Sequence, residues 1–149
     1  MKLLAPAKIN LYLKVLGKRS DGYHELLTLM VPVGLFDEIA MEKAERGVFV
    51  RAPGCGCNGA SNLAYKAAEL FLKETGLREG VAIRIAKNIP LGAGLGGGSS
   101  DASTVLMGMN ELFHTRIQRR ELMKMAGRIG ADCPFFILKK PCLMGGRGD

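Results

Sequence analysis

The glycine-rich stretch from Pro90 to Ala102 is the part of the sequence best suited to bind a phosphate. It has the sequence PLGAGLGGGSSDA, with five glycines among residues 92–98. Glycines lack the Cβ atoms that would keep a polyanion away from the backbone, and they adopt positive φ easily, so successive N–H groups can converge on one anion. A helical pattern follows directly, and the unpaired N–H groups of its first turn would add to the same positive pole. The sequence therefore predicts a phosphate-binding loop here.

Two familiar nucleotide-binding motifs match this stretch only in part. A P-loop needs a lysine that reaches the β- and γ-phosphates, and no lysine lies between Leu91 and Ser103. Residues 92–97 satisfy the dinucleotide fingerprint G-x-G-x-x-G, but the helical pattern that follows leads to a second helical pattern rather than to a strand and an acidic residue. A flexible glycine linker is disfavoured because apolar periodicity borders the stretch at both ends.

Phosphoryl transfer mainly requires positioning and charge neutralisation, from a phosphate cradle, a cation and an acid near the accepting hydroxyl. Lys8 is the candidate cation and Asp132, at an element boundary, is the candidate acid. The hydroxyls of Ser99 and Ser100 could meet a phosphate oxygen or a magnesium ion. An aspartate with a pKa near ~4 is a poor base, but orientation matters more in a loose transition state. Simpler interpretations stay open: Lys8 could be a solvated surface lysine, and Asp132 could serve only as a turn residue.

Other reactive side chains indicate no second chemistry. Only one residue separates Cys55 from Cys57, and Cys133 and Cys142 form no further pair with them at metal-ligand spacing. We therefore expect free thiols. His24 lies in a predicted hairpin and is expected to be a surface or packed histidine, so nucleophilic catalysis is not supported.

The elements that must position these residues follow from the hydrophobic periodicity. In the first extended run, Ile9 and Leu11 alternate with Lys8 and Asn10, so Lys8 is expected to face away from the apolar set and toward solvent. The predicted strands are residues 2–17, 23–31, 37–43, 48–51, 81–85 and 134–138, the first two forming one hairpin and the next two a second extended pair. The predicted helices are residues 61–76, capped by Ser61, then 102–113 and 122–129, the last with Thr115 and Gln118 as a capping pair. This order predicts an α+β fold.

Composition limits the partners and the location. The chain has 149 residues, enough for one domain, with 48% hydrophobic and 23% charged residues. Its net charge of +7 favours an anionic partner, which could be a nucleotide, a phosphorylated metabolite or a nucleic acid. The basic residues are dispersed and not interleaved with the three tyrosines and six phenylalanines, so base stacking has little support. No membrane span or signal peptide is indicated, and a cytoplasmic location is expected.

The residues of the loop carry a resemblance to a known family. Residues 90–102 resemble the P-x-x-x-G-L-G-(G)-S-S-A phosphate loop of the GHMP kinases. Two further parts of the sequence narrow the resemblance. Residues 5–11 with 19–26, which include Asp21-Gly22-Tyr23-His24, and residues 130–136, which read GADCPFF, are similar to the members that act on a cytidine-diphosphate-linked methylerythritol in non-mevalonate isoprenoid biosynthesis.

The resemblance implies a two-layer mixed sheet packed by helices, as in domain 2 of ribosomal protein S5. It also implies an ATP- and Mg²⁺-dependent kinase that phosphorylates the 2-hydroxyl of this small-molecule substrate. Asp132 would orient or deprotonate that hydroxyl and Lys8 would lie beside it. Ser99 would also contact the metal. The residues expected to bind the ATP phosphates are Pro90, Gly92, Gly94, Leu95, Gly96, Gly97, Gly98, Ser99 and Ser100. The residues expected to contact the cytidine end of the substrate are Asn10, Tyr23 and His24.

Members of this family place a second domain over the substrate cleft. The resemblance therefore implies that residues 1–149 are the N-terminal, ATP-binding domain, that the C-terminal domain is absent from this chain, and that an open cleft could leave the chain inactive. The alternative hypothesis is a non-catalytic nucleotide- or RNA-binding module with the same S5-like fold. No membrane partner is expected, and nucleic acid is the less favoured ligand.

Overall fold

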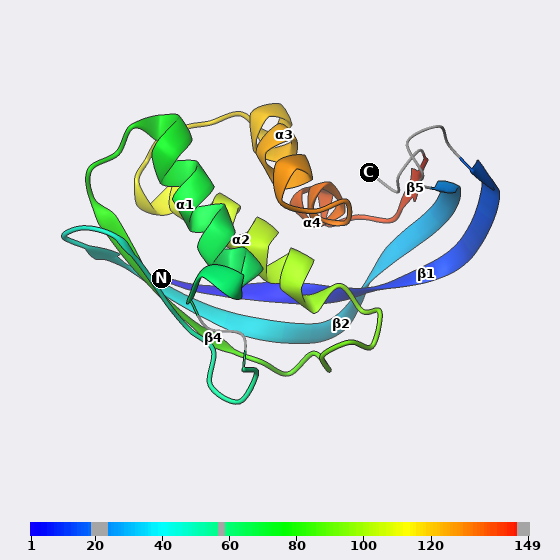
Figure 1. Cartoon of the computed structure of the whole chain (residues 1–149), viewed down its shortest axis with the longest axis horizontal. Coiled ribbons are helices and arrows are strands. Elements are labelled where there is room, and N and C mark those ends of the chain that lie inside the picture. The colour runs from blue at the N-terminus through cyan, green and yellow to red at the C-terminus, as the bar shows by residue number, and fades with distance from the viewer. Residues whose placement is uncertain (19–23, 57–58, 146–149) are drawn as a thin grey trace.

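Two long antiparallel strands form the base of the molecule, and helices lie on one side of them (Figure 1). The computed structural model describes residues 1–18, 24–56 and 59–145. The strands are β1 (Lys2–Lys18), β2 (His24–Ala44), β3 (Val48–Arg51), β4 (Gly80–Ala86) and β5 (Cys142–Met144). The helices are α1 (Leu63–Thr75), α2 (Gly97–Leu112), α3 (Arg119–Ile129) and α4 (Cys133–Leu138), with a short 3₁₀ turn, η1 (Gly59–Ser61), before α1.

The sheet is mixed. Its strand order is β1-β2-β4-β3. The short strand β5 lies off this order and pairs with residues 28–30 of β2. All pairs are antiparallel except β3 with β4, which is parallel. The predicted α+β class with a mixed sheet packed by helices is confirmed.

Two predictions about the strands are wrong. Residues 24–44 form one strand rather than two, because β1 pairs with it along its length, with register shifts where residues bulge out of the ladder. Residues 48–51 do not pair with 37–43. Instead β4 inserts between them and pairs with both β2 and β3.

Residues 133–138 form the helix α4 and not the predicted strand. The run Pro134 to Ile137 is buried throughout, so its apolar residues show no periodicity that separates a strand from a helix. Pro134 in the first turn favours a helix start, because its missing N–H would have no helical partner there.

Two predicted caps are also wrong. Asn62, not Ser61, is the N-cap of α1, and its Oδ1 accepts the N–H of Ala64 at 2.9 Å. Gln118 is the N-cap residue of α3 and makes no side-chain cap bond. Thr115, the other predicted capping residue, instead donates to Asn110 Oδ1 at 2.7 Å.

The core lies between the sheet and the helices. Ile39 and Ile85 on the sheet pack with Phe71 of α1 and Leu106 of α2, and all four are buried. Each such side chain contributes about 1.5–3 kcal/mol relative to an exposed position. Phe135 and Phe136 of α4 form a smaller cluster with Met30 of β2 and Met144 of β5.

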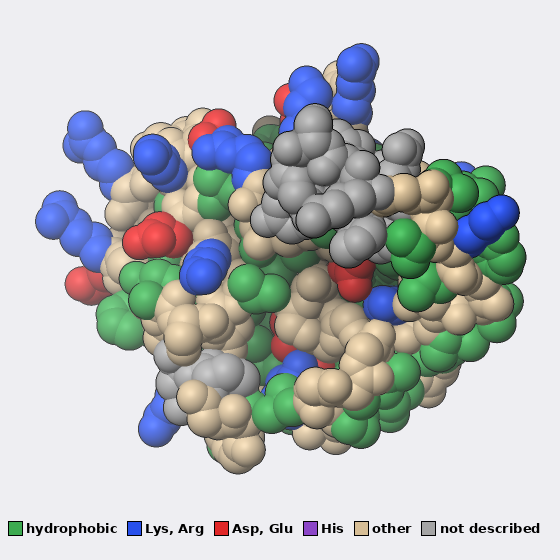
Figure 2. Space-filling model, turned by 45° about the vertical axis from the view of Figure 1, so that its right-hand side comes forward, with side chains coloured by type: hydrophobic (Ala, Val, Ile, Leu, Met, Phe, Trp, Pro, Cys, Tyr) green, Lys and Arg blue, Asp and Glu red, His purple; other side chains and the backbone are tan. Residues whose placement is uncertain are grey.

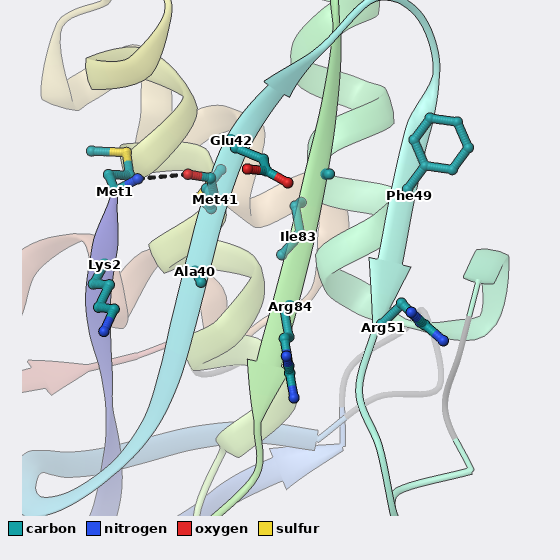
Figure 3. Close-up of a pocket in the computed structure, with 10 residues that line it drawn as sticks. Met1, Lys2, Ala40, Met41, Glu42, Phe49, Arg51, Ile83 and Arg84 are labelled. Carbon is teal, nitrogen blue, oxygen red and sulfur yellow. Dashed lines mark hydrogen bonds between the residues drawn. The ribbon is translucent and has the colours of Figure 1, made fainter.

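Within the described part of the chain, no helix covers the other face of the sheet (Figure 1). It carries a depression of about 470 Å³ with Lys2, Phe49, Arg51 and Arg84 among its lining residues (Figure 3). Neither Lys8 nor Asp132 lines it.

The thiols and the helices give two further findings. Cys133 and Cys142 are free, as expected, but Cys55 is disulfide-bonded, which corrects the expectation for that residue. Among the described residues, every helix is too short or too polar to cross a membrane.

Candidate functional site

The glycine loop connects β4 to α2 and is held at its exit by β1. The N–H of Lys8 donates to Leu95 O at 2.9 Å. Gly92, Gly94 and Gly96 have φ near +70°, a conformation that side chains other than glycine rarely adopt. At Gly96 a Cβ would lie 2.8 Å from the Phe136 ring and 3.1 Å from Lys8 Cγ. The loop therefore approaches the Lys8 side chain as closely as a backbone without a side chain allows.

The first turn of α2 faces the loop. Gly96 is its N-cap residue and makes no side-chain cap, and by helix geometry the N–H groups of residues 97–99 have no acceptor four residues back. Such N–H groups, with the helix dipole, form a ready site for an anion. The exposed residues 90–94 precede this turn. The phosphate cradle predicted from the sequence stays a prediction, to which this arrangement of backbone N–H groups is suited.

Lys8 and Asp132 meet beside this loop. Their Nζ and Oδ2 atoms are 3.5 Å apart, with the Lys8 side chain 8% exposed and that of Asp132 33% exposed. Lys8 thus faces away from Ile9 and Leu11 as predicted, but the expectation that it faces solvent is wrong. The apolar side chain of Leu11 is 62% exposed, whereas Lys8, whose backbone N–H bonds the loop, is buried.

A short polar relay holds the Lys8 ammonium. Lys8 Nζ donates to Asn10 Oδ1 at 2.6 Å, and Asn10 Nδ2 donates to Thr28 Oγ1 at 2.6 Å. Thr28 is buried and donates to Tyr12 O at 2.8 Å. Sequence reasoning missed Thr28, although a lone hydroxyl residue in the apolar run Leu27–Met30 was a signal. Asn10, predicted to contact substrate, is here a ligand of the lysine.

Asp132 lies at the N-terminus of α4, where its carboxylate makes no capping bond. The turn before it contacts the start of α2: Ser99 Oγ lies 3.9 Å from where a Gly130 Cβ would be. Ser103 Oγ donates to Cys133 O at 2.7 Å. Burial raises the pKa of the Cys133 thiol, while hydrogen bonds with Ser99 and Ser103 act in the opposite direction. These contacts fix Asp132 relative to the phosphate loop.

The two loop serines differ. Ser99 is partly exposed and remains the candidate to meet a phosphate or a metal. Ser100 is fully buried, its N–H donates to Gly96 O, and its hydroxyl has no partner among the described residues. In this conformation Ser100 offers no accessible group to ATP.

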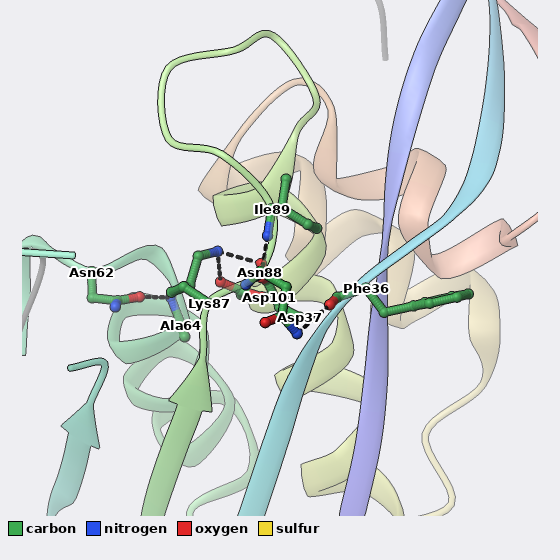
Figure 4. Close-up of polar contacts among 8 residues, drawn as sticks. All are labelled: Phe36, Asp37, Asn62, Ala64, Lys87, Asn88, Ile89 and Asp101. Carbon is green, nitrogen blue, oxygen red and sulfur yellow. Dashed lines mark hydrogen bonds and ion pairs between the residues drawn. The ribbon is translucent and has the colours of Figure 1, made fainter. Parts of the chain in front are cut away.

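A second lysine lies on the other side of the loop, in a buried cluster (Figure 4). Lys87 Nζ contacts Asp37 Oδ2 and lies 2.7 Å from Asp101 Oδ2. Burial raises the pKa of Asp101 to about 7, although the hydrogen bond and charge of Lys87 lower it. Burial lowers the pKa of Lys87, but the two carboxylates outweigh this and the net shift is upward. Asp101 therefore neither caps α2 nor is free to hold a metal.

Magnesium fits this site only with help from the nucleotide. Among the described residues no cluster of three or more His, Cys, Asp or Glu could hold a metal. Mg²⁺ is usually bound by one or two protein groups together with phosphates and water. The partly exposed Ser99 is the loop residue whose hydroxyl would fit such a shared coordination.

The other two substrate-contact predictions are not addressed by the described structure. Tyr23 lies outside the described residues, and His24 begins β2 with its side chain outside what the structure describes.

In the space-filling view the molecule is hollowed, with acidic and basic side chains at the hollow, while the remaining Lys and Arg side chains are spread singly over the face (Figure 2).

Comparisons with known proteins identify relatives. Residues 62–140 match the model of the GHMP kinases N terminal domain. A 4-diphosphocytidyl-2-C-methyl-D-erythritol kinase of Geobacter sp. (strain M21) is 52% identical, over 100% of this chain and 54% of the relative. The kinase of the same name from Syntrophus aciditrophicus (strain SB) is 45% identical over the same shares. The chain thus spans about half the length of the curated relatives it matches.

Solved kinase structures superpose on this chain over its whole length. A crystal structure of 4-(cytidine 5'-diphospho)-2C-methyl-D-erythritol kinase superposes with a TM-score of 0.88 at 44% identity, covering 100% of this chain and 53% of that one. The Methanococcus jannaschii mevalonate kinase superposes with a TM-score of 0.70 at 14% identity, over 100% of this chain and 54% of that one. The second likeness shows the shared fold alone.

Proposed function

Because this chain belongs to the GHMP kinase family, we propose that it is the ATP-binding part of a kinase that phosphorylates the 2-hydroxyl of 4-diphosphocytidyl-2-C-methyl-D-erythritol. This reaction belongs to non-mevalonate isoprenoid biosynthesis. The relatives that support the substrate carry this name and are 45–52% identical. The cytoplasmic location stays a prediction.

The observation that carries the proposal is the Lys8–Asp132 pair beside the phosphate loop. The two groups are 3.5 Å apart, and Lys8 bonds the loop through its backbone N–H. A third of the Asp132 side chain is exposed, so an acceptor hydroxyl can reach its carboxylate. A cradle, a cation and an acid thus lie together, as phosphoryl transfer requires.

The proposed step uses these residues in fixed roles. ATP with Mg²⁺ supplies the γ-phosphoryl group and part of the charge neutralisation. Asp132 orients the 2-hydroxyl and receives its proton as the oxygen bonds to phosphorus and ADP leaves. Lys8, held by Asn10, stabilises the negative charge that develops between the two reactants. The N–H groups of residues 97–99 hold the phosphates in line.

Substrate recognition is the less supported part of the proposal. Asn10 already binds Lys8 and Thr28, so we propose that it acts first as a support for the lysine. Tyr23 and His24 remain the proposed contacts for the cytidine end. A base pocket built on hydrogen bonds would reject substrates without the matching groups.

The experiment is a coupled ADP-release assay on the purified 149-residue chain, with and without 4-diphosphocytidyl-2-C-methyl-D-erythritol. Substrate-dependent ADP is expected from the wild type. The Asp132→Asn variant should lose turnover by about 10²–10⁴-fold while calorimetry shows unchanged MgATP binding. No substrate-dependent ADP from the wild type would reject activity of this chain.

The same preparation tests the non-catalytic alternative. Binding of a phosphate backbone weakens steeply as salt rises, whereas MgATP held in a backbone cradle should be less sensitive. An RNA module would bind a single-stranded oligonucleotide tightly at low salt and show no turnover. The dispersed Lys and Arg side chains (Figure 2) give that alternative no specific support.

A further inference from the structure

Three buried charged residues beside the loop have no role in the proposed transfer. Asp37 is on β2, Lys87 follows β4, and Asp101 is in the first turns of α2. Their side chains are 0%, 9% and 3% exposed. Charges this deeply buried carry a desolvation cost, so their retention next to the loop calls for a reason.

Asp37 holds the backbone at the point where the loop leaves the sheet. The β2–β4 ladder ends at the pair Glu38–Ala86. Beyond it, Asp37 Oδ1 accepts the N–H of Asn88 at 2.6 Å and that of Ile89 at 2.8 Å. These charge-assisted bonds replace the missing ladder (Figure 4). One carboxylate thus sets the direction in which the chain leaves β4.

A second contact fixes Asn88 to the same strand. Its Nδ2 donates to Phe36 O at 2.9 Å. Asn88 is therefore tied to β2 through both its backbone and its side chain, directly before the exposed loop residues 90–94.

Lys87 links this entry point to the exit of the loop. Its ammonium bonds Asp37 and also Asp101, which lies one turn into α2. At Gly97, the first residue of α2, a Cβ would lie 3.3 Å from Lys87 Nζ and 3.1 Å from Ile89 Cγ2. The residues before the loop therefore pack directly on the residue after it.

We propose that Asp37, Lys87 and Asp101 form a positioning cluster that locks both ends of the phosphate loop together and so holds its exposed glycines ready for the triphosphate. In this role the cluster acts through the backbone of the loop. It removes the conformational freedom that five glycines would otherwise have to lose on binding. The consequence for ATP affinity rests on the proposed function, whereas the consequence for loop order does not.

A purely structural role predicts a different result. A buried ion pair can often be replaced without loss of stability, and a general loss of stability would loosen the whole domain. The positioning role predicts a local loosening of residues 88–97, together with weaker MgATP binding.

The test is amide hydrogen exchange on the full chain with three variants. Asp37→Ala removes the acceptor of both N–H groups, and Asp37→Asn restores an oxygen at the same place. Phe71→Leu, in the core at the far end of α1, is the control for a general loss of stability. Exchange in residues 88–97 should rise about 10- to 100-fold in Asp37→Ala, beyond the change in Phe71→Leu. Asp37→Asn should recover most of the protection.

Calorimetry with MgATP gives the second measurement. We expect Kd to rise about tenfold or more in Asp37→Ala and to change little in Phe71→Leu. If the wild type bound no MgATP, the proposed function would fail, while the exchange comparison would still test the cluster. Equal loop exchange in Asp37→Ala and Phe71→Leu, or no recovery in Asp37→Asn, would overturn it.

If Asp37→Ala does not fold, the double variant Lys87→Met/Asp101→Asn takes its place. It keeps the bonds of Asp37 to the backbone and removes the link to α2. Exchange should then rise at the exit, residues 95–99, and less at residues 88–89. Uniform protection at the wild-type level would overturn the proposal.

Discussion

Two lysine–aspartate arrangements flank the glycine loop, and they differ in burial and in pairing. Asp132 is one-third exposed, and its closest approach to Lys8 is 3.5 Å. Asp37 is fully buried, and its carboxylate accepts bonds from Lys87, Asn88 and Ile89. The same two residue types therefore serve differently. The open pair keeps the Asp132 carboxylate accessible to a ligand, whereas both oxygens of the Asp37 carboxylate accept bonds from the protein.

The largest effect is expected from a substitution of Lys8, which tests the role of the open pair. Lys8→Met keeps a side chain of similar length but removes the charge, and we expect kcat to fall about 10²–10³-fold with MgATP affinity little changed. Lys14→Met, an exposed lysine of the same strand, is the matched control and should leave turnover unchanged. Equal kcat in the two variants would assign Lys8 a structural role. Steady-state kinetics with both substrates is the measurement.

The pH dependence of the unfolding free energy tests the burial of Asp101 in the cluster. The pKa of Asp101 is about 7 in the folded chain, against an ordinary value of 3.8. A raised folded pKa gives stability at low pH that is lost as pH rises from about 4 to about 7. Asp101→Asn carries no such group, so its stability relative to wild type should improve by about 3 kcal/mol between about pH 4.5 and about pH 8. Denaturant unfolding across this range checks it, and a constant difference would contradict it.

The contact between the loop and Lys8 is tested at Gly96. With φ of +72° and Phe136 only 2.8 Å from a new Cβ, Gly96→Ala should cost about 1–3 kcal/mol of unfolding free energy. The control is Gly127→Ala in α3, where the nearest atom is 3.7 Å away and a gain of about 0.5–1 kcal/mol is expected. Similar unfolding midpoints for both variants would contradict the close approach of residue 96 to Phe136 and Lys8.

The smallest expected effects lie in the relay behind Lys8. Asn10→Ala removes the acceptor of the lysine ammonium and should lower kcat about tenfold. Thr28→Val leaves Asn10 without its own support and should lower it by about threefold. If Asn10→Ala raised the KM for the cytidine substrate without changing kcat, the residue would be a substrate contact instead.

The sequence was informative wherever a local rule decided the structure. The glycine run, the α2 pattern and the candidate residues Lys8 and Asp132 could be found because a phosphate loop and its proposed partners use recognisable residue types. The membership of the GHMP kinase family indicated by the loop is confirmed. Residues 133–138 could not be assigned correctly, because burial on all sides removes periodicity.

Long-range pairing set the other limit. Nothing local indicates that β4 inserts between β2 and β3. Nothing local brings Asp37 to Lys87, which lies 50 residues away. Each charge of that cluster looks like a surface residue by itself, and its burial is visible only when three elements are assembled. The same limit hid the role of Thr28.

The central claim is tested most directly by locating the transferred phosphate. The chain, MgATP and 4-diphosphocytidyl-2-C-methyl-D-erythritol are incubated, and the product is examined by ³¹P NMR and mass spectrometry beside an Asp132→Asn sample. We predict one new phosphomonoester on the 2-hydroxyl with the wild type and almost none with the variant. ADP without a phosphorylated acceptor, or equal product from both proteins, would contradict the account.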